Sequence, residues 1–586
     1  MTAIGVRKTA EVLALWPLAV NVLAALSPVV VLVSGGSALA LLLPLAALLL
    51  IGWRQRRTLL RVPRGIGGSG RYITARYLLL ATAAAHLYAR GDLDIAAMLV
   101  LVLAVLALAQ EPLLRSLSSL AVPYAANLPD REARNSAVFP YGWIFPANLL
   151  GVAVLVVAPL APQPLLPLAA LLVLTSLGVA LVALVDVVRR IRDRRAFQAG
   201  LPQFLERMQP VFYVYWHAPA RSAFQVTMWL PYLERLGVPF ALVVRTASTF
   251  RQLAAATEHP VLLRRSLADL DDLIVPSLRG VFYVNNAMRN NHMVRYSQLT
   301  HIQLLHGESD KASSANPVIR MYDLDFVAGQ AAIDRFEKFG VPMPREMFRI
   351  VGRPQVENIE PERAPIGQLA ERTVLYAPTW AGYQAETNYS SLLAGPAIVA
   401  GLLSRGCRVV FRPHPYSART PELSEACEEI RQMLEADTEA TGREHLHGDL
   451  AEREMDVVDC INACDAMISD VSAIVGDFLH SGKPLSMVSP RTGAEEFLEQ
   501  FPMARAAYVL EADGSAPRGL DAMLEALIDT DPRREERRDW ATYYLGDIPR
   551  ENYAERFVHV AREELGLLAE EQEPLDATAS APSVDE

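Results

Sequence analysis

Long apolar runs fill the first 188 residues and are the feature that most constrains how this chain can fold. A helix needs about 20 apolar residues to cross the hydrocarbon core of a bilayer, with about 17 as the low end. The first and last runs pass this test easily, and the others need flanking residues to complete a span. We therefore expect a bundle of about six transmembrane helices in residues 1–188, with four or five as the alternative. The runs lie at about Val12–Val33, Ala38–Trp53, Tyr72–Tyr88, Ile95–Gln110, Trp143–Leu160 and Pro164–Val188.

Arginines are distributed unevenly between the loops that join these runs. The loops at 34–37, 90–94 and 161–163 carry only Arg90, whereas the loops on the other side are rich in arginine. Because Lys and Arg are enriched in cytoplasmic loops, both termini are expected in the cytoplasm, in a multi-pass protein of the cell membrane. No cleaved signal peptide is expected, because further spans follow the first run. The arginine-rich loops contain Arg54, Arg56, Arg57, Arg61, Arg64 and Arg71; then Arg115, Arg131 and Arg134; then Arg189, Arg190, Arg192, Arg194 and Arg195.

The overall charge narrows the class of partner. A formal net charge of −10 argues against nucleic acid. Residues 189–209 are expected to form a basic juxtamembrane linker, which would be attracted to anionic membrane lipids. The four cysteines, Cys407, Cys427, Cys460 and Cys464, all follow the apolar half and have no paired metal spacing. They are expected to be reduced thiols in the core.

Short β-rich runs alternate with helical stretches from Pro210 onward, which is typical of doubly wound parallel sheets. Two such series predict two α/β domains in tandem, at residues 210–360 and 373–566. They are separated by a polar, proline-containing linker at 361–372 and followed by an acidic tail at 567–586 that is expected to be disordered. The expected strands of the first series are Val211–Trp216, Phe240–Arg245, Val281–Asn286, His301–His306 and Asp325–Gln330. Those of the second are Thr373–Trp380, Cys407–Pro415, Ala466–Asp470 and Pro484–Ser489.

The stretch "HIQLLHGESDK" ends the fourth expected strand in His306 and Gly307. Ligands of doubly wound sheets bind at the carboxyl ends of the strands, so a histidine there is placed to act as a base at a pocket rim. Gly307 is expected to permit an unusual backbone turn that holds it. The alternative is a surface loop with an incidental histidine.

Two further strand ends carry groups suited to phosphate. In "FRPHPYS", two prolines restrain the backbone around Arg412 and His414. In "MISDVSAIVGDFLHSGKP", a strand is expected to lead into a helix whose first turn holds Ser472, and a helix start is a common phosphate site. Lys483 could add charge, although lysines at such positions are usually only solvated.

Metal-binding patterns are weak. Acid pairs occur at Asp269/Asp271 and Asp323/Asp325, and "HLHG" contains His445 and His447. These pairs lie in ordinary acidic segments or a surface loop, so we expect no metal site in the protein, although a divalent cation in the reaction is left open.

The motifs together carry a resemblance. "IQLLHGESDK", "FVAGQ", "IVGRPQ", "VLYAPTW", "FRPHP" and "DAMISDVSAIVGDFLHSGKPL" occur in the order found in the CDP-glycerol glycerophosphotransferase family, which makes teichoic-acid-type polyol phosphate polymers in bacteria. The resemblance covers roughly residues 210–566 and no part of the membrane half. It implies a GT-B fold of two nucleotide-sugar-transferase domains. It also implies a catalytic histidine at His306 and a second, His414, at the donor pyrophosphate.

The chain departs from that family's pattern beside the first histidine. Leu305, Glu308 and Ser309 replace the usual residues, while Lys311 matches. Ala473 replaces the second of two serines, and Ala381–Gly382 stand where an arginine is often found. An acidic Glu308 would repel an anionic acceptor end, so the resemblance supports the donor better than the acceptor.

The expected function is transfer of a polyol phosphate from a CDP-activated donor to a hydroxyl of a lipid-linked or glycan acceptor, with release of CMP. Such transfer needs positioning, a proton acceptor and stabilisation of the leaving phosphate, and an imidazole suits the proton acceptor near neutral pH. Alternatives are a GT-B glycosyltransferase using a nucleotide sugar and a lipid acceptor, or a transporter or lipid-binding module with a regulatory domain. The expected site comprises His306 and His414 as catalytic residues and Gly307, Lys311, Thr379, Arg412, Ser469, Asp470, Ser472 and Asp477 as substrate-binding residues.

Overall fold

The computed structural model describes residues 3–60, 70–120, 124–128, 141–219, 222–307, 309–382 and 388–568. The chain divides into two compact units, Met1–Phe204 and Leu205–Glu586, which are described separately below. Most of the expected acidic tail and part of the arginine-rich loop after the second apolar run lie outside the described residues, as does Glu308.

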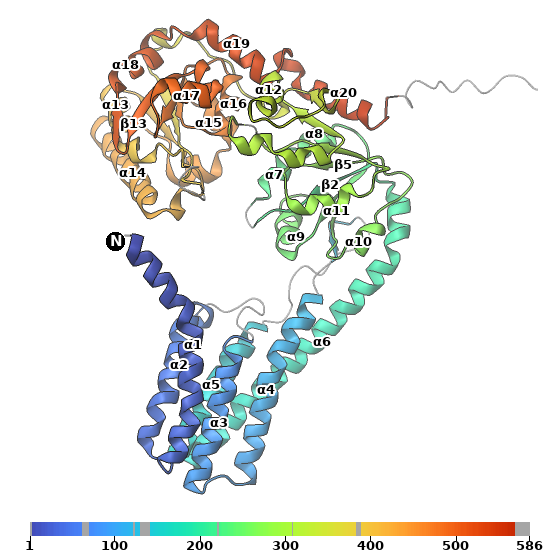
Figure 1. The fold of residues 1–586 in the computed structure, drawn as a ribbon, viewed down its shortest axis with the longest axis vertical. Helices are drawn as coiled ribbons and strands as arrows, with labels where there is room; N and C mark the ends of the chain where they lie inside the picture. The colour runs from blue at the N-terminus through green and yellow to red at the C-terminus, as the bar shows by residue number, and fades with distance from the viewer. Residues whose placement is uncertain are drawn as a thin grey trace, which may run out of the picture. The chain divides into compact units, whose positions relative to one another are not determined.

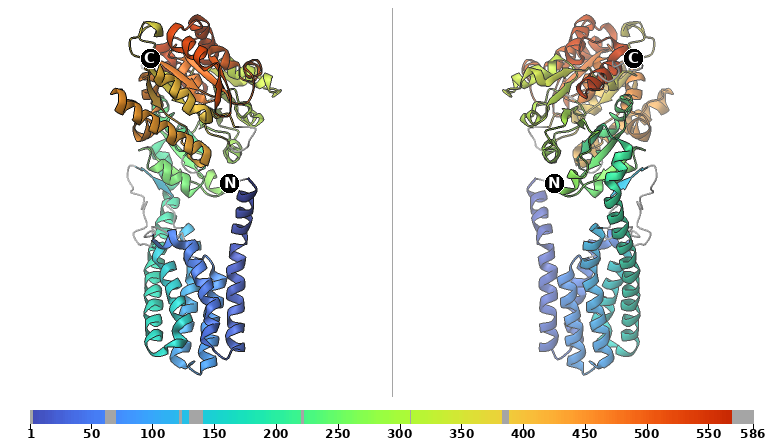
Figure 2. Two further views of the ribbon diagram at one scale, coloured as in Figure 1. Left: turned by 90° about the vertical axis from the view of Figure 1, so that its left-hand side faces the viewer. Right: turned by 90° about the vertical axis from the view of Figure 1, so that its right-hand side faces the viewer.

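The first unit is helical, and its helices run side by side in the views of Figure 1 and Figure 2. Four segments are long and apolar enough to cross a membrane: Trp16–Val33, Ala38–Arg56, Ile95–Ser118 and Pro162–Met208. The described helices are α1 (Ala3–Val33), α2 (Leu42–Leu60), α3 (Ile73–Arg90), α4 (Ile95–Leu120), α5 (Ile144–Val157) and α6 (Pro162–Met208).

Two of the six expected spans do not reach this standard. Helix α5 has only 14 residues, and α3 carries Arg76, His86 and Arg90. The structure therefore supports membrane association through four candidate spans, and transmembrane positions for α3 and α5 remain predictions. Helix α6 also continues without interruption through the arginine cluster to Met208, where a linker was expected at 189–209.

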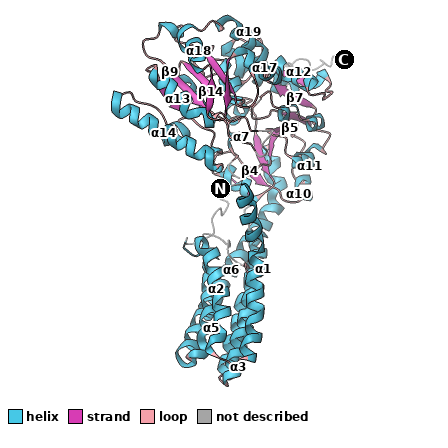
Figure 3. Cartoon of the chain, turned by 60° about the vertical axis from the view of Figure 1, so that its left-hand side comes forward, coloured by secondary structure: helices cyan, strands magenta, loops and turns pink. Residues whose placement is uncertain are grey.

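The second unit contains two sheets, drawn in magenta in Figure 3. In the first, strands run in the order β4-β3-β2-β5-β6-β7-β8, and every neighbouring pair is parallel. Strand β2, for example, is buried along its whole length, as expected for a strand covered on both faces. The bounds are β2 (Phe212–Trp216), β3 (Phe240–Val244), β4 (Val261–Leu263), β5 (Gly280–Tyr283), β6 (Thr300–Gln303), β7 (Leu324–Val327) and β8 (Phe348–Ile350).

The second sheet has the order β10-β9-β11-β12-β13-β14 and is parallel except for the final hairpin. Strand β9 separates β10 from β11, so the direction of winding reverses there, and the ends of these three strands face one crevice. The bounds are β9 (Thr373–Ala377), β10 (Arg408–Phe411), β11 (Ala466–Ser469), β12 (Leu485–Ser489), β13 (Tyr508–Asp513) and β14 (Ala516–Arg518).

The expected α/β class is confirmed, and each strand expected from the sequence is present in shortened form. The sequence did not predict β4, β8, β13 or β14. Strands β4 and β8 have only three residues each, and β13 alternates buried and partly exposed residues as an element near a sheet edge.

The last helices, α19 (Arg534–Leu545) and α20 (Tyr553–Glu564), return to the first sheet domain. Phe557 of α20 packs against Trp229 at 5.3 Å and against Phe326 at 6.2 Å between ring centroids. Arg562 donates to Leu236 O at 2.6 Å. Residues 553–564, expected in the second α/β domain, therefore pack on the first. The sequence could not show this, because the periodicity of a helix does not reveal which sheet it covers.

Candidate active site

His306 follows β6 and has a defined tautomer. Its Nδ1 lies 2.8 Å from Val284 O, and because a carbonyl only accepts, this nitrogen carries the proton. Its Nε2 lies 3.3 Å from Nε2 of Gln225. The Gln225 amide is oriented by its oxygen, which accepts from Trp216 Nε1 at 3.1 Å and Asn285 Nδ2 at 2.9 Å. The Gln225 NH₂ group therefore donates to His306, whose Nε2 presents a lone pair.

The electrostatic surroundings keep His306 neutral. Burial lowers the pKa of the His306 imidazole, the hydrogen bond to Val284 O opposes this, and the positive charge of Arg353 lowers it further. A neutral imidazole is the form that accepts a proton, and here its Nε2 lone pair accepts a hydrogen bond from the Gln225 NH₂ group.

The turn that presents His306 is made by Leu305 and not by Gly307. Leu305 has a φ of 51°, whereas Gly307 is not among the residues with positive φ, so the expectation that Gly307 provides the unusual turn is wrong. Trp229 Nε1 holds the strained residue by donating to Leu305 O at 2.7 Å. Gly307 is instead needed for close approach, because a Cβ there would lie 3.1 Å from Cβ of Ala473.

The loop after His306 is fastened to the second α/β domain. Asp310 is buried, and its Oδ2 accepts from Met503 N and from the Tyr544 hydroxyl, each at 2.8 Å. Lys311 Nζ lies 5.6 Å from the ring centroid of Tyr389. Burial lowers the pKa of Lys311, and the charge of Asp470 opposes this. The loop thus carries His306 from one sheet and Lys311 toward the strand ends of the other.

His414 follows β10 and has the opposite tautomer. Its Nδ1 accepts from Tyr416 N at 3.1 Å, so in the neutral ring Nε2 carries the proton. Burial, followed by the charges of Lys311 and Arg419, lowers the pKa of His414 to about 4. Trp380 stacks on it with ring centroids 6.0 Å apart. At neutral pH His414 is therefore an uncharged donor.

Asp470, at the end of β11, is fully buried and satisfied by the protein. Its carboxylate accepts from Thr379 N at 2.9 Å, Ser391 N at 2.9 Å and Ser391 Oγ at 3.0 Å. Burial raises its pKa to about 6, and these hydrogen bonds and the Lys311 charge oppose the rise. Ser469 is also buried, and its hydroxyl donates to Ala377 O at 2.7 Å. These contacts of Ser469, Asp470 and the Thr379 backbone shape the strand ends, and substrate binding by the three residues stays a prediction.

Ser472 precedes α16 (Ala473–Leu479) and makes no side-chain capping bond to it. Asp477, within α16, forms a salt bridge with Arg353 through both carboxylate oxygens. Arg353 comes from the segment after β8 and also acts on the pKa of His306. It therefore links the candidate base to the helix that begins beside Gly307, and Asp477 is engaged in that link.

Arg412 is engaged with the backbone. Its Nη1 donates to Ala451 O, to Met455 O at 2.8 Å and to the Cys460 thiol at 3.6 Å. These contacts hold the segment around Leu450–Glu454 beside β10. The geometry gives Arg412 a supporting position and gives no contact to the groups around His306.

One residue of each candidate metal-binding pair is engaged by another group of the protein. Asp269 Oδ2 accepts from Arg265 N at 2.8 Å, Asp323 Oδ2 accepts from His301 N at 2.7 Å, and His445 pairs with Asp437 at 2.9 Å. Within the described ranges, no group of three or more His, Cys, Asp or Glu is arranged to hold a metal ion. The four cysteines are buried and unpaired.

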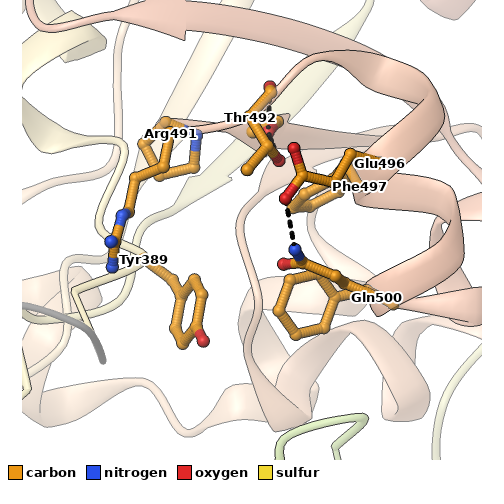
Figure 4. Close-up of a pocket in the computed structure, with 9 residues that line it drawn as sticks. Tyr389, Arg491, Thr492, Glu496, Phe497 and Gln500 are labelled. Carbon is orange, nitrogen blue, oxygen red and sulfur yellow. Dashed lines mark hydrogen bonds between the residues drawn. The ribbon is translucent and has the colours of Figure 1, made fainter.

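Two cavities adjoin this region and share Tyr389, Gln500 and Phe501. One, of about 340 Å³, is lined by Asp310, Lys311, Lys338 and Phe339 as well. The other, of about 290 Å³, lies at the end of β12. Figure 4 shows Arg491 and Tyr389 on one side of it and Glu496, Phe497 and Gln500 on the other.

Sequence reasoning missed four residues that shape the site: Gln225, Asp310, Arg353 and Tyr389. Asp310 and Arg353 lie inside the quoted motifs, "HGESDK" and "IVGRPQ", so their motifs pointed to them. Gln225 and Tyr389 lie in unremarkable stretches, and only the fold brings them to His306 and Lys311.

One part of the chain matches a known protein family. Residues 350–539 match the family described as CDP-Glycerol:Poly(glycerophosphate) glycerophosphotransferase, which confirms the resemblance over this range. The match includes His414, Arg412 and Asp470, whereas His306, Gly307 and Lys311 precede it. Among curated proteins, no sequence matches the chain.

Solved structures resemble the chain only distantly. A variant of the wall teichoic acid polymerase TagF soaked with CDPG is 12% identical, with a TM-score of 0.39, over 66% of this chain and 96% of that one. A putative UDP-N-acetylglucosamine 2-epimerase from Listeria monocytogenes is 13% identical, with a TM-score of 0.41, over 62% and 98%. UDP-GlcNAc 2-epimerase from Neisseria meningitidis bound to UDP-GlcNAc is 12% identical, with a TM-score of 0.38, over 61% and 99%.

Proposed function

We propose, from the match of residues 350–539 to the CDP-glycerol:poly(glycerophosphate) glycerophosphotransferase family, that this enzyme transfers a polyol phosphate from a CDP-activated donor to an acceptor hydroxyl. CMP is the leaving group. The acceptor is lipid-linked or a glycan, and the product is a teichoic-acid-like polymer of the bacterial cell wall.

The observation that carries this proposal is the pair of histidine tautomers. His306 offers a lone pair on Nε2, and His414 offers a proton on Nε2. Transfer of a phosphoryl-linked group needs both functions, a proton acceptor for the nucleophile and a donor toward the phosphate that carries the developing charge. The loop between His306 and Lys311 joins the two sides of the site through Asp310.

In the proposed reaction, the acceptor hydroxyl oxygen attacks the phosphorus that bears the polyol. Its proton passes to His306 Nε2 as the new P–O bond forms and the P–O bond to CMP breaks. His414 Nε2–H donates to an oxygen of the diphosphate, and Lys311 supplies positive charge nearby. After transfer, the proton on His306 returns to solvent, which restores the neutral base.

No metal is assigned to the protein in this scheme. A divalent cation could enter bound to the donor diphosphate, where it would neutralise phosphate charge. Turnover measured with added Mg²⁺ and with a chelator tests this assignment.

The membrane half gives the proposal its location. The four candidate spans support membrane association. We place the enzyme in the cytoplasmic membrane with both termini and the α/β domains in the cytoplasm, as the arginine asymmetry requires. Membrane lipids are then partners of the first unit.

A donor screen tests the activity. Membranes that contain the full chain are supplied with CDP-glycerol, CDP-ribitol or UDP-N-acetylglucosamine, and nucleotide release is measured. Turnover of a CDP-polyol with release of CMP is the expected result. Turnover of the UDP-sugar alone would establish the glycosyltransferase alternative, and a chain that turns over no donor would contradict the proposal.

A further inference from the structure

A cavity of about 480 Å³ opens at one end of the helix bundle in the first unit, far in sequence from the histidines. It is formed by α1, α2 and the segment that begins α3, and its polar lining includes Arg54, Gln55 and Arg71 beside Asn21, Tyr72 and Thr74. The described residues that line it include no Asp or Glu. Arg54 and Arg71 are therefore the charged residues of its described lining.

A buried ion pair lies behind Gly70, one of the residues that line this cavity. Arg76 Nη1 and Nη2 donate to the two carboxylate oxygens of Glu111 at 2.5 and 2.7 Å, and both side chains are 0% exposed. Glu111 Oε2 also accepts from Gly70 N at 2.7 Å. A buried pair must have good geometry to offset the cost of desolvating both charges. Here the pair fixes the backbone immediately before Arg71.

Two further helices complete this network. Asn148 of α5 donates to Glu111 Oε1 at 2.8 Å, and Ser176 of α6 donates to Asn148 Oδ1 at 2.5 Å. Polar groups buried in an apolar bundle are costly, so a connected network through α3, α4, α5 and α6 indicates a functional site nearby. The hydrogen bond from Gly70 N to Glu111 joins this network to the lining of the cavity.

Arg71 is held at the cavity by a side chain of α2. Its Nη1 donates to Gln55 Oε1 at 2.7 Å, and Gln55 is only 5% exposed. Arg54 precedes Gln55 and lines the same cavity. The two guanidinium groups therefore come from different elements and are brought together by packing.

The apolar spans indicate the level at which the cavity lies relative to the membrane. One candidate span begins at Trp16 and the next ends at Arg56, and the cavity lies where these two ends meet. Trp16 and Trp53 pack against each other there, with ring centroids 5.3 Å apart. Tryptophans gather at membrane–water interfaces, so this is the level of the lipid headgroups.

We propose that this cavity binds the phosphate of a lipid headgroup. Guanidinium groups match phosphate in charge and geometry, and basic pockets between membrane helices bind anionic headgroups. The phosphate can belong to an anionic phospholipid or to a polyprenyl phosphate carrier, because both present it at this depth. This inference does not depend on the proposed transferase activity.

The test uses the full chain in neutral detergent, with lipid adducts counted by native mass spectrometry. Dioleoylphosphatidylglycerol, dioleoylphosphatidylcholine, a polyprenyl monophosphate and inorganic phosphate are added separately. We expect the first adduct to form with the anionic lipids and to be at least about tenfold weaker with phosphatidylcholine, whose headgroup carries no net charge. The tighter of the two anionic lipids identifies the source of the phosphate. Equal binding of phosphatidylcholine, or binding of inorganic phosphate as tight as that of the lipids, would overturn the assignment.

The double variant R54Q/R71Q removes both charges and keeps the side-chain length nearly unchanged. It should weaken the anionic lipid adduct at least about tenfold. The control is R56Q, because Arg56 lies on the same helix but is directed to Trp53, donating to its carbonyl at 3.1 Å and lying 4.9 Å from its ring centroid. Loss in R56Q equal to that in the double variant would reject the cavity as the site.

A second variant guards against misfolding. R54K/R71K retains the charges, so it should bind the anionic lipid more tightly than R54Q/R71Q, with the same helical content by circular dichroism. If the lysine and glutamine variants bind equally weakly while both remain folded, charge is not what the cavity recognises, and the proposal fails.

Discussion

The two histidines of the candidate active site, His306 and His414, use their Nδ1 atoms in opposite ways. Nδ1 of His306 donates to Val284 O at 2.8 Å, whereas Nδ1 of His414 accepts from Tyr416 N at 3.1 Å. As a result, Nε2 of neutral His306 carries the lone pair that can take a proton, and Nε2 of neutral His414 carries the hydrogen that can be donated. Backbone contacts thus assign each ring its part before any substrate binds.

The first prediction concerns His306→Asn. General-base catalysis contributes typically about 10²–10⁴-fold, so turnover should fall on that scale while donor affinity changes by less than about tenfold. CMP release and equilibrium donor binding are measured on the same purified variant. His259→Asn is the matched control, because His259 lies outside the site. Its Nε2 pairs with Glu234 Oε1 at 2.6 Å. Turnover within a few-fold of the parent would show that His306 is not the base.

The second prediction concerns pH. His306 must be neutral to act, and burial lowers its pKa, so kcat/KM should hold as pH falls to about 6.5 and decline only below it. Gln225→Glu keeps the oxygen that Trp216 and Asn285 donate to but places a carboxylate against Nε2. An opposite charge raises the pKa of an imidazole, so the acidic limb should move to higher pH. If the acidic limb of the kcat/KM profile is unchanged in Gln225→Glu, Gln225 does not control the pKa of the base.

The third prediction distinguishes His414 from Arg412. His414→Ala should weaken donor binding and turnover together, because a hydrogen bond to phosphate acts in both ground and transition states. Arg412→Ala should instead lower stability by about 1–3 kcal/mol, since it removes the guanidinium that donates to the part-buried carbonyls of Ala451 and Met455. Thermal unfolding and donor binding are measured for both. If the Arg412→Ala protein is stable but no longer binds the donor, Arg412 is a donor-binding residue and not a supporting one.

The fourth prediction concerns Gly307. A Cβ at this position would lie 3.1 Å from Cβ of Ala473, so Gly307→Ala should push the His306 loop away from α16 and reduce turnover. In the control Gly493→Ala, the new Cβ would meet its nearest atom, Glu511 Oε1, at an ordinary 3.7 Å. Steady-state kinetics are compared at equal helical content. Equal activity in the two variants would mean that the close approach has no catalytic role.

The fifth prediction concerns topology. Asp92→Cys should react with a membrane-impermeant maleimide on intact cells, and Arg56→Cys should react only after the cells are opened. The four native cysteines are buried, so they should add little background. The reverse labelling pattern would invert the orientation.

The sequence by itself determined the elements and the chemistry at their ends. Apolar runs marked the helices of the first unit, and buried β-rich runs marked nearly every long strand of the second. Strand ends identified His306 and His414, since parallel sheets direct these ends toward ligands. These features are local, and local patterns are what a sequence displays.

Only the tertiary structure decided what each polar side chain does. Arg412 and Asp470 look like ligands in their motifs, but the fold places backbone carbonyls beside one and backbone amides beside the other. Gln225, 81 positions before His306, sets the environment of the base, and α20 returns to cover the first sheet. The role of a charged or amide group depends on which partners lie within hydrogen-bonding distance, and those partners are brought together by packing across long sequence separations.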